Sequence, residues 1–342
     1  MSAPSVEHER HLLSCLDDVL DAPEADRSAV IKSRFGTDPV VVRDLERLLA
    51  AAAHADAMLL AERADIVLQP VLSDLEAQSV SDAEVPAGFT RALAPRYSLL
   101  ERIGSGGMAS VYLAFDTALG RNVAIKSLRP ELADGISRER FEREIEIAAS
   151  IDHPHAVPVY DRGEADGRLF YVMRYVEGGS LRDLLLERPQ LEIRKAIDIA
   201  RDVAEALDAA HAKNVVHRDI KPANILLDRH GAHLADFGVA RLIDAAGRER
   251  LTRTGLALGT AAYMSPEQVG SASQVDARSD VYALACVLYE MLAGEAPFTG
   301  PTPRDIVAKH LAATIPDLTV VRATVTRPMQ QVIATALQKA PA

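Results

Sequence analysis

The sequence has no tryptophan, only two cysteines, and no apolar run long enough to cross a membrane. Because Cys15 and Cys286 lie far apart in the chain, we expect neither a disulfide framework nor a cysteine-based zinc site, and a reducing compartment fits. The charged N-terminus lacks the apolar segment of a secretory signal. These absences predict a cytoplasmic chain without a membrane segment of its own, and they leave open an anchor downstream of residue 342.

Basic residues are also too few for a general nucleic-acid binder. The 342 residues carry 38 Lys and Arg against 49 Asp and Glu, a net charge of -11, whereas proteins that bind a phosphate backbone are usually basic. Hydrophobic residues make up 48% of the chain and charged residues 25%, which is typical of a globular protein with a sizeable core. We therefore expect no nucleic-acid partner.

The acidic charge is concentrated at the N-terminus, since residues 1–95 hold 17 acidic and 8 basic residues. Apolar residues in this part recur at steps of three and four, as in Leu12, Leu16 and Val19, which is typical of amphipathic helices. Asp38 before Pro39 is a helix start signal. We predict a helical segment of unknown role over residues 1–78 and a linker over 79–96, where Ser, Pro, Gly and Ala occur without periodicity.

After residue 96 the pattern changes to short β-rich runs followed by helices. The first part, residues 97–175, is predicted as a small strand-rich unit with one helix, and residues 176–342 as a larger helical unit. The fold class is therefore α+β with two lobes, preceded by an all-α segment. Strands are predicted at 97–103, 110–115, 122–128, 156–160, 169–175, 225–227 and 233–235, and helices at 137–151, 193–213 and 281–292.

A glycine-rich segment joins the first two predicted strands. It reads Gly104-Ser105-Gly106-Gly107-Met108-Ala109-Ser110-Val111, and residues without side chains let backbone amides approach phosphate oxygens. A dinucleotide-binding loop is disfavoured because a strand follows instead of a helix, and a Walker loop lacks its Gly-Lys-Ser/Thr ending. Taken alone, the segment fits a phosphate loop and a flexible hairpin turn equally well.

Lys126 ends the run Val123-Ala124-Ile125-Lys126 on the third predicted strand. Such a lysine either lies on an edge strand, where its charge opposes aggregation, or is a buried cation that needs an acidic partner. The helix at 137–151 offers Glu142, Glu144 and Glu146. Helical spacing places Glu144 on the face that also carries Phe141 and Ile145, so Glu144 is the predicted partner.

A third group of candidate site residues, with acidic and amide side chains, lies between residues 217 and 236. Asp219 and Asn224 lie in the run His217-Arg218-Asp219-Ile220-Lys221-Pro222-Ala223-Asn224, and Asp236 follows a predicted hairpin. Asp219 can accept a hydroxyl proton, while Asn224 and Asp236 offer oxygen ligands to a hard divalent cation. Each alone also fits a turn-capping residue, but their order behind a glycine loop and a strand lysine favours a joint site.

These motifs resemble those of the bacterial eukaryotic-type (Hanks-type) serine/threonine protein kinases. The resemblance covers residues 97–342 and implies the bilobal kinase fold, with an N-lobe at 97–175 and a C-lobe at 176–342. It implies ATP and Mg²⁺, with Mn²⁺ as a substitute, and transfer of the γ-phosphate to Ser/Thr hydroxyls of protein substrates in bacterial signalling. The motifs are the glycine loop, Val-Ala-Ile-Lys, His-Arg-Asp-x-Lys-x-x-Asn, Asp-Phe-Gly and Gly-Thr-x-x-Tyr-x-Ser-Pro-Glu at 259–267.

The resemblance also implies a role for each catalytic residue. Lys126, held by Glu144, would pair with the α- and β-phosphates, while Asn224 and Asp236 would bind Mg²⁺. Asp219 would orient the acceptor hydroxyl and Lys221 would steady the γ-phosphate. Thr260 would form hydrogen bonds with Asp219 and Lys221. The presence of Lys221 and Thr260 favours Ser/Thr over Tyr substrates.

An ATP site across both lobes is implied by the same comparison. The loop would cover the phosphates, Met173 would be the gatekeeper, and adenine would bind the backbone of the hinge, where Arg174 replaces the acid often found. The implied ATP-binding residues are Ile103, Gly104, Ser105, Gly106, Gly107, Met108, Ala109, Ser110, Val111, Ala124, Lys126, Met173, Arg174, Val176 and Leu226.

Regulation is implied by the segment between the Asp-Phe-Gly and Ser-Pro-Glu motifs. We expect autophosphorylation at Thr252 or Thr254, with the phosphate paired to Arg218, and a homodimer would allow the reaction in trans. The alternative is that both threonines are solvated loop residues. Asp280 has two readings that both fit, a helix N-cap and a brace for the backbone of the His217 loop.

One departure concerns the end of the sequence. In the family an arginine pairs with the glutamate that corresponds to Glu267, but here the chain stops at Ala342 before that arginine and the last helix. A truncated piece or a weakened C-lobe would explain this. Two rival hypotheses are a pseudokinase that binds without catalysis, and a working role for the acidic helical leader in docking a partner or covering the cleft.

Overall fold

The computed structural model describes residues 86–106, 109–129, 137–237, 261–270 and 275–340, together with the isolated residues 31 and 42. The chain divides between Glu84 and Val85 into two units, and the second unit contains both predicted lobes. The predicted helices of residues 1–78 lie outside the described residues, apart from those two positions.

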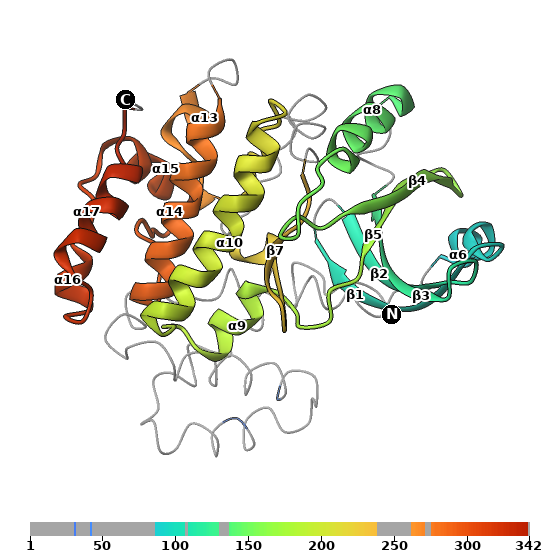
Figure 1. Ribbon diagram of the computed structural model, residues 1–342, viewed down its shortest axis with the longest axis horizontal. Helices are drawn as coiled ribbons and strands as arrows, with labels where there is room; N and C mark the ends of the chain where they lie inside the picture. The colour runs from blue at the N-terminus through green and yellow to red at the C-terminus, as the bar shows by residue number, and fades with distance from the viewer. Residues whose placement is uncertain are drawn as a thin grey trace. The chain divides into compact units, whose positions relative to one another are not determined.

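Five antiparallel strands form the N-lobe sheet in the order β1-β2-β3-β5-β4 (Figure 1). Their bounds are Tyr97–Ser105 for β1, Ala109–Asp116 for β2, Arg121–Leu128 for β3, Val159–Ala165 for β4 and Arg168–Arg174 for β5. Side chains of β5 alternate between two clusters, with Tyr171 and Met173 on one face and Phe170 and Val172 on the other. This alternation is the two-residue period of a strand buried on both faces.

The predicted linker contains a helix, which corrects the linker prediction. Helix α6 spans Ala87–Leu93 and buries Phe89 and Leu93, one turn apart, against the outer face of the sheet. The ring of Phe89 lies 6.0 Å from those of Tyr112 and Phe170. Burial of these apolar side chains stabilises a helix too short to form alone, so the folded lobe begins ahead of Tyr97.

Helix α8, Arg138–Ala149, covers the other face of the sheet. Ser137 caps it by accepting a hydrogen bond from the backbone of Arg140, as serine does at helix starts. Its buried residues are Phe141, Glu144, Ile145 and Ala148, which confirms the predicted inward face.

The strand predicted at 156–160 begins later than expected. Ala156 forms an isolated parallel bridge with Leu234, and β4 starts at Val159, directly after Pro158. Proline has no backbone N–H to donate to a strand ladder. The segment before Pro158 therefore bonds to the C-lobe instead of to β5.

The C-lobe is helical, as predicted. Its central pair is α10, Ile193–His211, and α14, Ala277–Ala293, which pack against each other. The β-hairpin of β6, Ile225–Asp228, and β7, Gly231–Leu234, lies beside α10. The remaining elements are α9 Leu181–Glu187, η3 Pro222–Asn224, α13 Pro266–Gly270, α15 Pro303–Ala312, α16 Leu318–Val321 and α17 Arg327–Ala336. Within the described ranges, no helix is both long and apolar enough for a membrane span.

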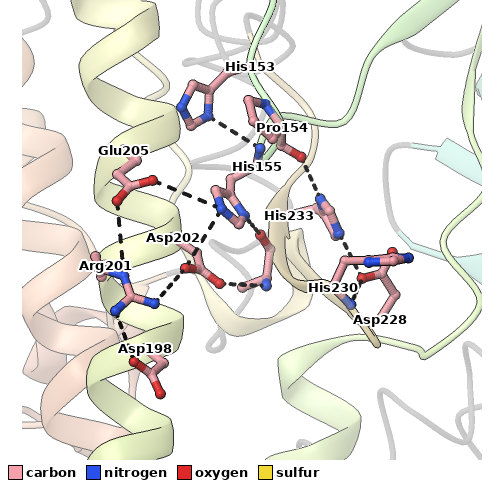
Figure 2. Close-up of polar contacts among 11 residues, drawn as sticks. His153, Pro154, His155, Asp198, Arg201, Asp202, Glu205, Asp228, His230 and His233 are labelled. Carbon is pink, nitrogen blue, oxygen red and sulfur yellow. Dashed lines mark hydrogen bonds and ion pairs between the residues drawn. The ribbon is translucent and has the colours of Figure 1, made fainter.

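A polar joint connects the α8–β4 loop to β7 and α10 (Figure 2). His155 Nδ1 donates to the carbonyl of Ala232 at 2.8 Å, and His233 Nδ1 donates to the carbonyl of Pro154 at 2.9 Å. Asp202 of α10 accepts from the Ala232 backbone at 3.0 Å. Gly231 is required beside it, because its φ is +129° and an added Cβ would lie 2.4 Å from Asp202. The joint fixes one side of the N-lobe to the C-lobe.

Candidate active site

The loop between α10 and β6 brings three of the predicted catalytic side chains together. Asn224 Nδ2 donates to the backbone oxygen of Asp219 at 2.7 Å and to its carboxylate at 2.9 Å. Lys221 Nζ lies 2.9 Å from the same carboxylate. These charge-assisted bonds fix Asp219, and they leave the amide oxygen of Asn224 as the atom that can coordinate a metal.

Asp280 of α14 supports this loop through hydrogen bonds with the loop backbone. Its carboxylate accepts the backbone N–H groups of His217 and Arg218, each at 2.8 Å, and it lies 2.8 Å from His211 Nε2. The alternative N-cap role is wrong, because the cap of α14 is Asp276, which accepts from Arg278. The side chain of Asp280 is fully buried, so its charge is compensated by these donors.

Two site residues adopt a left-handed backbone that is unusual for residues other than glycine. The φ angles are +69° at Arg218 and +68° at Asp236. Such conformations cost on the order of 1–3 kcal/mol and occur mainly where the surroundings fix them. Here Asp280 holds the backbone of Arg218, while Asp236 is held through its side chain.

The strand lysine and the metal-binding aspartate form a direct ion pair. Lys126 Nζ lies 2.5 Å from Asp236 Oδ2, and Tyr171 donates to Asp236 Oδ1 at 2.6 Å. Burial raises the pKa of the Asp236 carboxyl, but the attraction of Lys126 and the two hydrogen bonds outweigh it and leave the pKa lowered. The carboxylate therefore stays ionised in a largely closed site.

This pair corrects the prediction that Lys126 is held by Glu144. Glu144 lies on the inner face of α8 and is only 6% exposed, as its helical position predicted. Lys126 nevertheless pairs with Asp236, whose carboxylate is held beside it by Tyr171. One buried carboxylate is enough to neutralise the ammonium charge.

His217 links the loop to the Asp-Phe-Gly motif. Its Nε2 lies 2.8 Å from the backbone oxygen of Ala235, and its ring contacts Phe237 edge to face at 4.9 Å between centroids. Both His217 and Phe237 are buried. The two halves of the site, 17 residues apart at Asp219 and Asp236, are thus joined through one histidine.

The predicted adenine slot is a shared apolar cluster. Val111 and Ala124 of the N-lobe belong to the same cluster as Leu226 of the C-lobe, together with Met173 and Val176. Ala124 and Met173 are direct partners across β3 and β5. Apolar side chains from both lobes suit contact with a flat, mostly apolar ring system.

The glycine loop is the hairpin between β1 and β2. Gly104 pairs with Val111 and Ser105 with Ser110, and the Gly106 amide donates to the Ala109 carbonyl at 3.0 Å. Ile103 is 42% exposed. Gly107 and Met108 lie outside the described residues, as do Thr252, Thr254 and Thr260.

Two contacts at the hinge and the Ser-Pro-Glu motif were missed from the sequence. Arg174 forms an ion pair with Asp228 at 2.7 Å, which ties the end of β5 to the end of β6. Glu267 accepts a hydrogen bond from Ser279 of α14. No periodicity or motif signals either pair, because their partners are 54 and 12 residues away.

The donor set fits a divalent cation bound together with a nucleotide. Carboxylate and amide oxygens of Asp236 and Asn224 are the ligands that Mg²⁺ prefers, and Mg²⁺ sites commonly take their remaining oxygens from substrate phosphates and water. In the described part of the chain, no cluster of three or more His, Cys, Asp or Glu could hold a metal by itself.

A five-stranded lobe and a helical lobe that together carry this constellation define a protein of the kinase class. The protein kinase domain model matches residues 97–342, so the chain belongs to the protein kinase family, and within it to the bacterial Hanks-type branch.

Named relatives agree with this assignment. The chain is 47% identical over 225 residues to serine/threonine-protein kinase PknB of Mycobacterium tuberculosis and 46% identical over 225 residues to PknB of Mycolicibacterium smegmatis, in each case over 64% of this chain and 36% of the relative. It is 43% identical over 249 residues to serine/threonine-protein kinase PknD of Mycobacterium tuberculosis, over 72% of this chain and 37% of the relative. The chain thus spans little more than a third of these relatives.

Proposed function

We propose that the chain transfers the γ-phosphoryl group of ATP to Ser or Thr hydroxyls of proteins and acts in bacterial signalling. The observation that carries this proposal is the joint placement of Asp219, Lys221 and Asn224 in one hydrogen-bonded loop. The Lys126–Asp236 pair on the other side of the site supports it. The relatives named as serine/threonine kinases support the class of acceptor.

Each residue contributes by position and charge. Lys126 exchanges its contact with Asp236 for the α- and β-phosphates, and the apolar cluster of Val111, Ala124 and Leu226 receives adenine. Asp219 orients the acceptor hydroxyl and takes its proton late, since a loose transition state asks little of the base. Lys221 stabilises charge that develops on the transferred group.

Asn224 and Asp236 hold the divalent cation. When bound there, such a cation would supply positive charge that neutralises the phosphates. We propose Mg²⁺ as the physiological ion and Mn²⁺ as a substitute, because both prefer oxygen ligands.

The test is incubation with labelled ATP and Mg²⁺, followed by mapping of the modified residues. Label on Ser or Thr is expected for the unaltered chain. Asp219→Asn should reduce transfer by roughly 10²-fold, the lower end of the usual contribution of a general base, and Lys126→Met serves as the second control. Transfer by the unaltered chain that does not exceed these controls would favour the rival, a pseudokinase that binds ATP without catalysis.

We also propose autophosphorylation at Thr252 or Thr254, with Arg218 as the partner of the phosphate and a homodimer allowing reaction in trans. A Thr252→Ala/Thr254→Ala chain is expected to show lower activity and less self-labelling. Full activity in this double variant would refute regulation by autophosphorylation at these threonines, and the proposal of kinase activity would still stand. Comparison of residues 86–342 with the whole chain tests whether the acidic N-terminal segment contributes.

A further inference from the structure

Tyr171 lies at the centre of the site, although none of the sequence motifs contains it. It sits on β5 directly opposite Lys126 of β3 in the strand register, and its side chain is 1% exposed. Its hydroxyl donates to Asp236 Oδ1 at 2.6 Å across 65 residues of sequence. Neighbours on the same face of β5 are Leu169 and Met173, which pack in the apolar cluster.

The hydroxyl acts only as a hydrogen-bond donor toward Asp236. Burial and the nearby Asp236 carboxylate keep the pKa of Tyr171 well above its usual value, so the phenol stays protonated. A phenol buried among apolar side chains needs a hydrogen-bond partner, and here the partner is an ionised carboxylate. A charge-assisted bond of this kind is stronger than a bond between neutral groups.

The two oxygens of Asp236 are therefore not equivalent. Oδ1 is held by Tyr171, while Oδ2 is held by Lys126, which is the residue expected to move to the phosphates. We propose that Tyr171 is a positioning residue for metal binding, which fixes Oδ1 of Asp236 so that Oδ2 remains the oxygen offered to the divalent cation. This inference rests on the proposed function, because it assumes that Asp236 binds the cation.

The expected effect is a loss of metal affinity without a loss of nucleotide affinity. Outer groups that orient a ligand typically contribute about 10–100-fold to metal affinity. Tyr171→Phe keeps the ring that fills the cluster and removes only the hydroxyl. We expect the dissociation constant of a fluorescent ATP analogue to be unchanged in EDTA, and its tightening by Mg²⁺ to be reduced about tenfold relative to the unaltered chain.

Tyr112→Phe is the matched control. Tyr112 is also buried, at 5% exposure, but it lies on β2 and packs in the cluster on the other face of the sheet, against Phe89. Loss of its hydroxyl should leave both dissociation constants unchanged. A general weakening of the sheet would affect both variants alike, so the pair separates positioning from packing.

The measurement is equilibrium binding of the analogue to the full chain, in EDTA and over a series of free Mg²⁺ concentrations. A Mg²⁺ response of Tyr171→Phe equal to or greater than that of the unaltered chain would overturn the inference. If Tyr171→Phe does not fold, Tyr171→Met replaces it, and failure of both to fold would show that the hydroxyl serves the core, which also overturns the positioning role. An unaltered chain that shows no Mg²⁺-dependent binding would instead contradict the proposed function.

Discussion

The two lobes hold their site residues by different physical means. In the N-lobe, strands with apolar side chains on both faces carry Lys126 and Tyr171 to Asp236. In the C-lobe, buried polar groups bonded to backbone hold the catalytic loop. Among the described residues the buried polar side chains are Asp116, Ser127 and Glu144 in the N-lobe and Asp202, His217, Asn224, His233, Ser265, Ser279, Asp280, Glu290 and His310 in the C-lobe.

This difference matters for function because hydrogen bonds are directional and apolar packing is not. A bonded loop is preorganised, as a catalytic base requires. A lobe held by packing tolerates small shifts, as exchange of Lys126 from Asp236 to a phosphate requires. Four predictions test this contrast, from the largest expected effect to the smallest.

The first prediction breaks the polar support of the catalytic loop. Asp280→Ala leaves the N–H groups of His217 and Arg218 buried without their acceptor. Removing one partner from a buried charged network costs about 3–5 kcal/mol, and the rate of transfer should fall with it. Urea unfolding and the kcat of the same preparation measure both effects.

The control for this variant is Asp276→Ala on the same helix. Asp276 is the half-exposed N-cap of α14, and loss of a cap costs about 1 kcal/mol. It should leave kcat unchanged. Equal effects of the two variants on kcat would mean that α14 acts as a whole and that Asp280 has no special role.

The second prediction weakens the apolar packing of the N-lobe. Phe89→Ala removes the fully buried ring that joins α6 to Tyr112 and Phe170. We expect a loss on the order of 3 kcal/mol, limited by the ability of a seven-residue helix to detach. The loss should appear in urea unfolding, while the Kd for nucleotide changes little because the cleft lies on the other face of the sheet.

Arg91→Ala on the exposed side of α6 is its control and should be close to neutral. A large loss of nucleotide affinity in Phe89→Ala would contradict the idea that the two faces of the sheet act independently. The contrast between lobes would then be weaker than proposed.

The third prediction uses the pH dependence of the C-lobe. Burial, and to a lesser extent nearby Lys339, lower the pKa of His310 from 6.5 to about 4, although hydrogen bonds with the backbone of Ala262 and Ala261 oppose the shift. The side chains of Tyr282 and Phe298 also face the ring. The folded state disfavours the protonated form of His310. The contribution of the neutral imidazole to the free energy of unfolding is therefore complete above pH 6.5, and it declines as the pH falls toward about 4. The decline should be on the order of 2 kcal/mol.

The measurement is urea unfolding of the unaltered chain and His310→Gln between pH 7 and pH 4.5. The stability difference between them should shrink as the pH falls. His230→Gln is the control, because His230 is exposed. A difference that is constant with pH would show that the pKa of His310 is the same in the folded and unfolded states.

Sequence reasoning found the parts of the site that depend on local pattern. The strand lysine, the His217–Asn224 run and Asp236 are read from residue type and spacing, because short motifs fix short-range geometry. Helix α8 and its buried Glu144 followed from helical periodicity. Strand positions in β1, β2 and β3 agreed to within two residues at each end.

The parts that failed depend on contacts distant in sequence. Helix α6 has only Phe89 and Leu93 as buried residues, and a helix that short draws its stability from the sheet it packs on. The partner of Lys126 is a carboxylate 110 residues away instead of the predicted Glu144, and local spacing carries no information on so distant a contact. Tyr171 is an ordinary strand residue until the fold places Asp236 beside it.

The smallest predicted effect lies at the hinge, where the two lobes meet. Arg174 and Asp228 form an ion pair whose side chains are 35% and 12% exposed. Solvent screening limits such a pair to about 1 kcal/mol or less. Because Asp228 also contacts His233 at 3.0 Å and accepts from the His230 backbone, Asp228→Asn alone should cost more than Arg174→Met alone.

The coupling energy from a double-mutant cycle isolates the contribution of the Arg174–Asp228 pair. A coupling near zero, with unchanged nucleotide affinity, would mean that the polar joint of His155, His233 and Asp202 connects the lobes without help from the hinge.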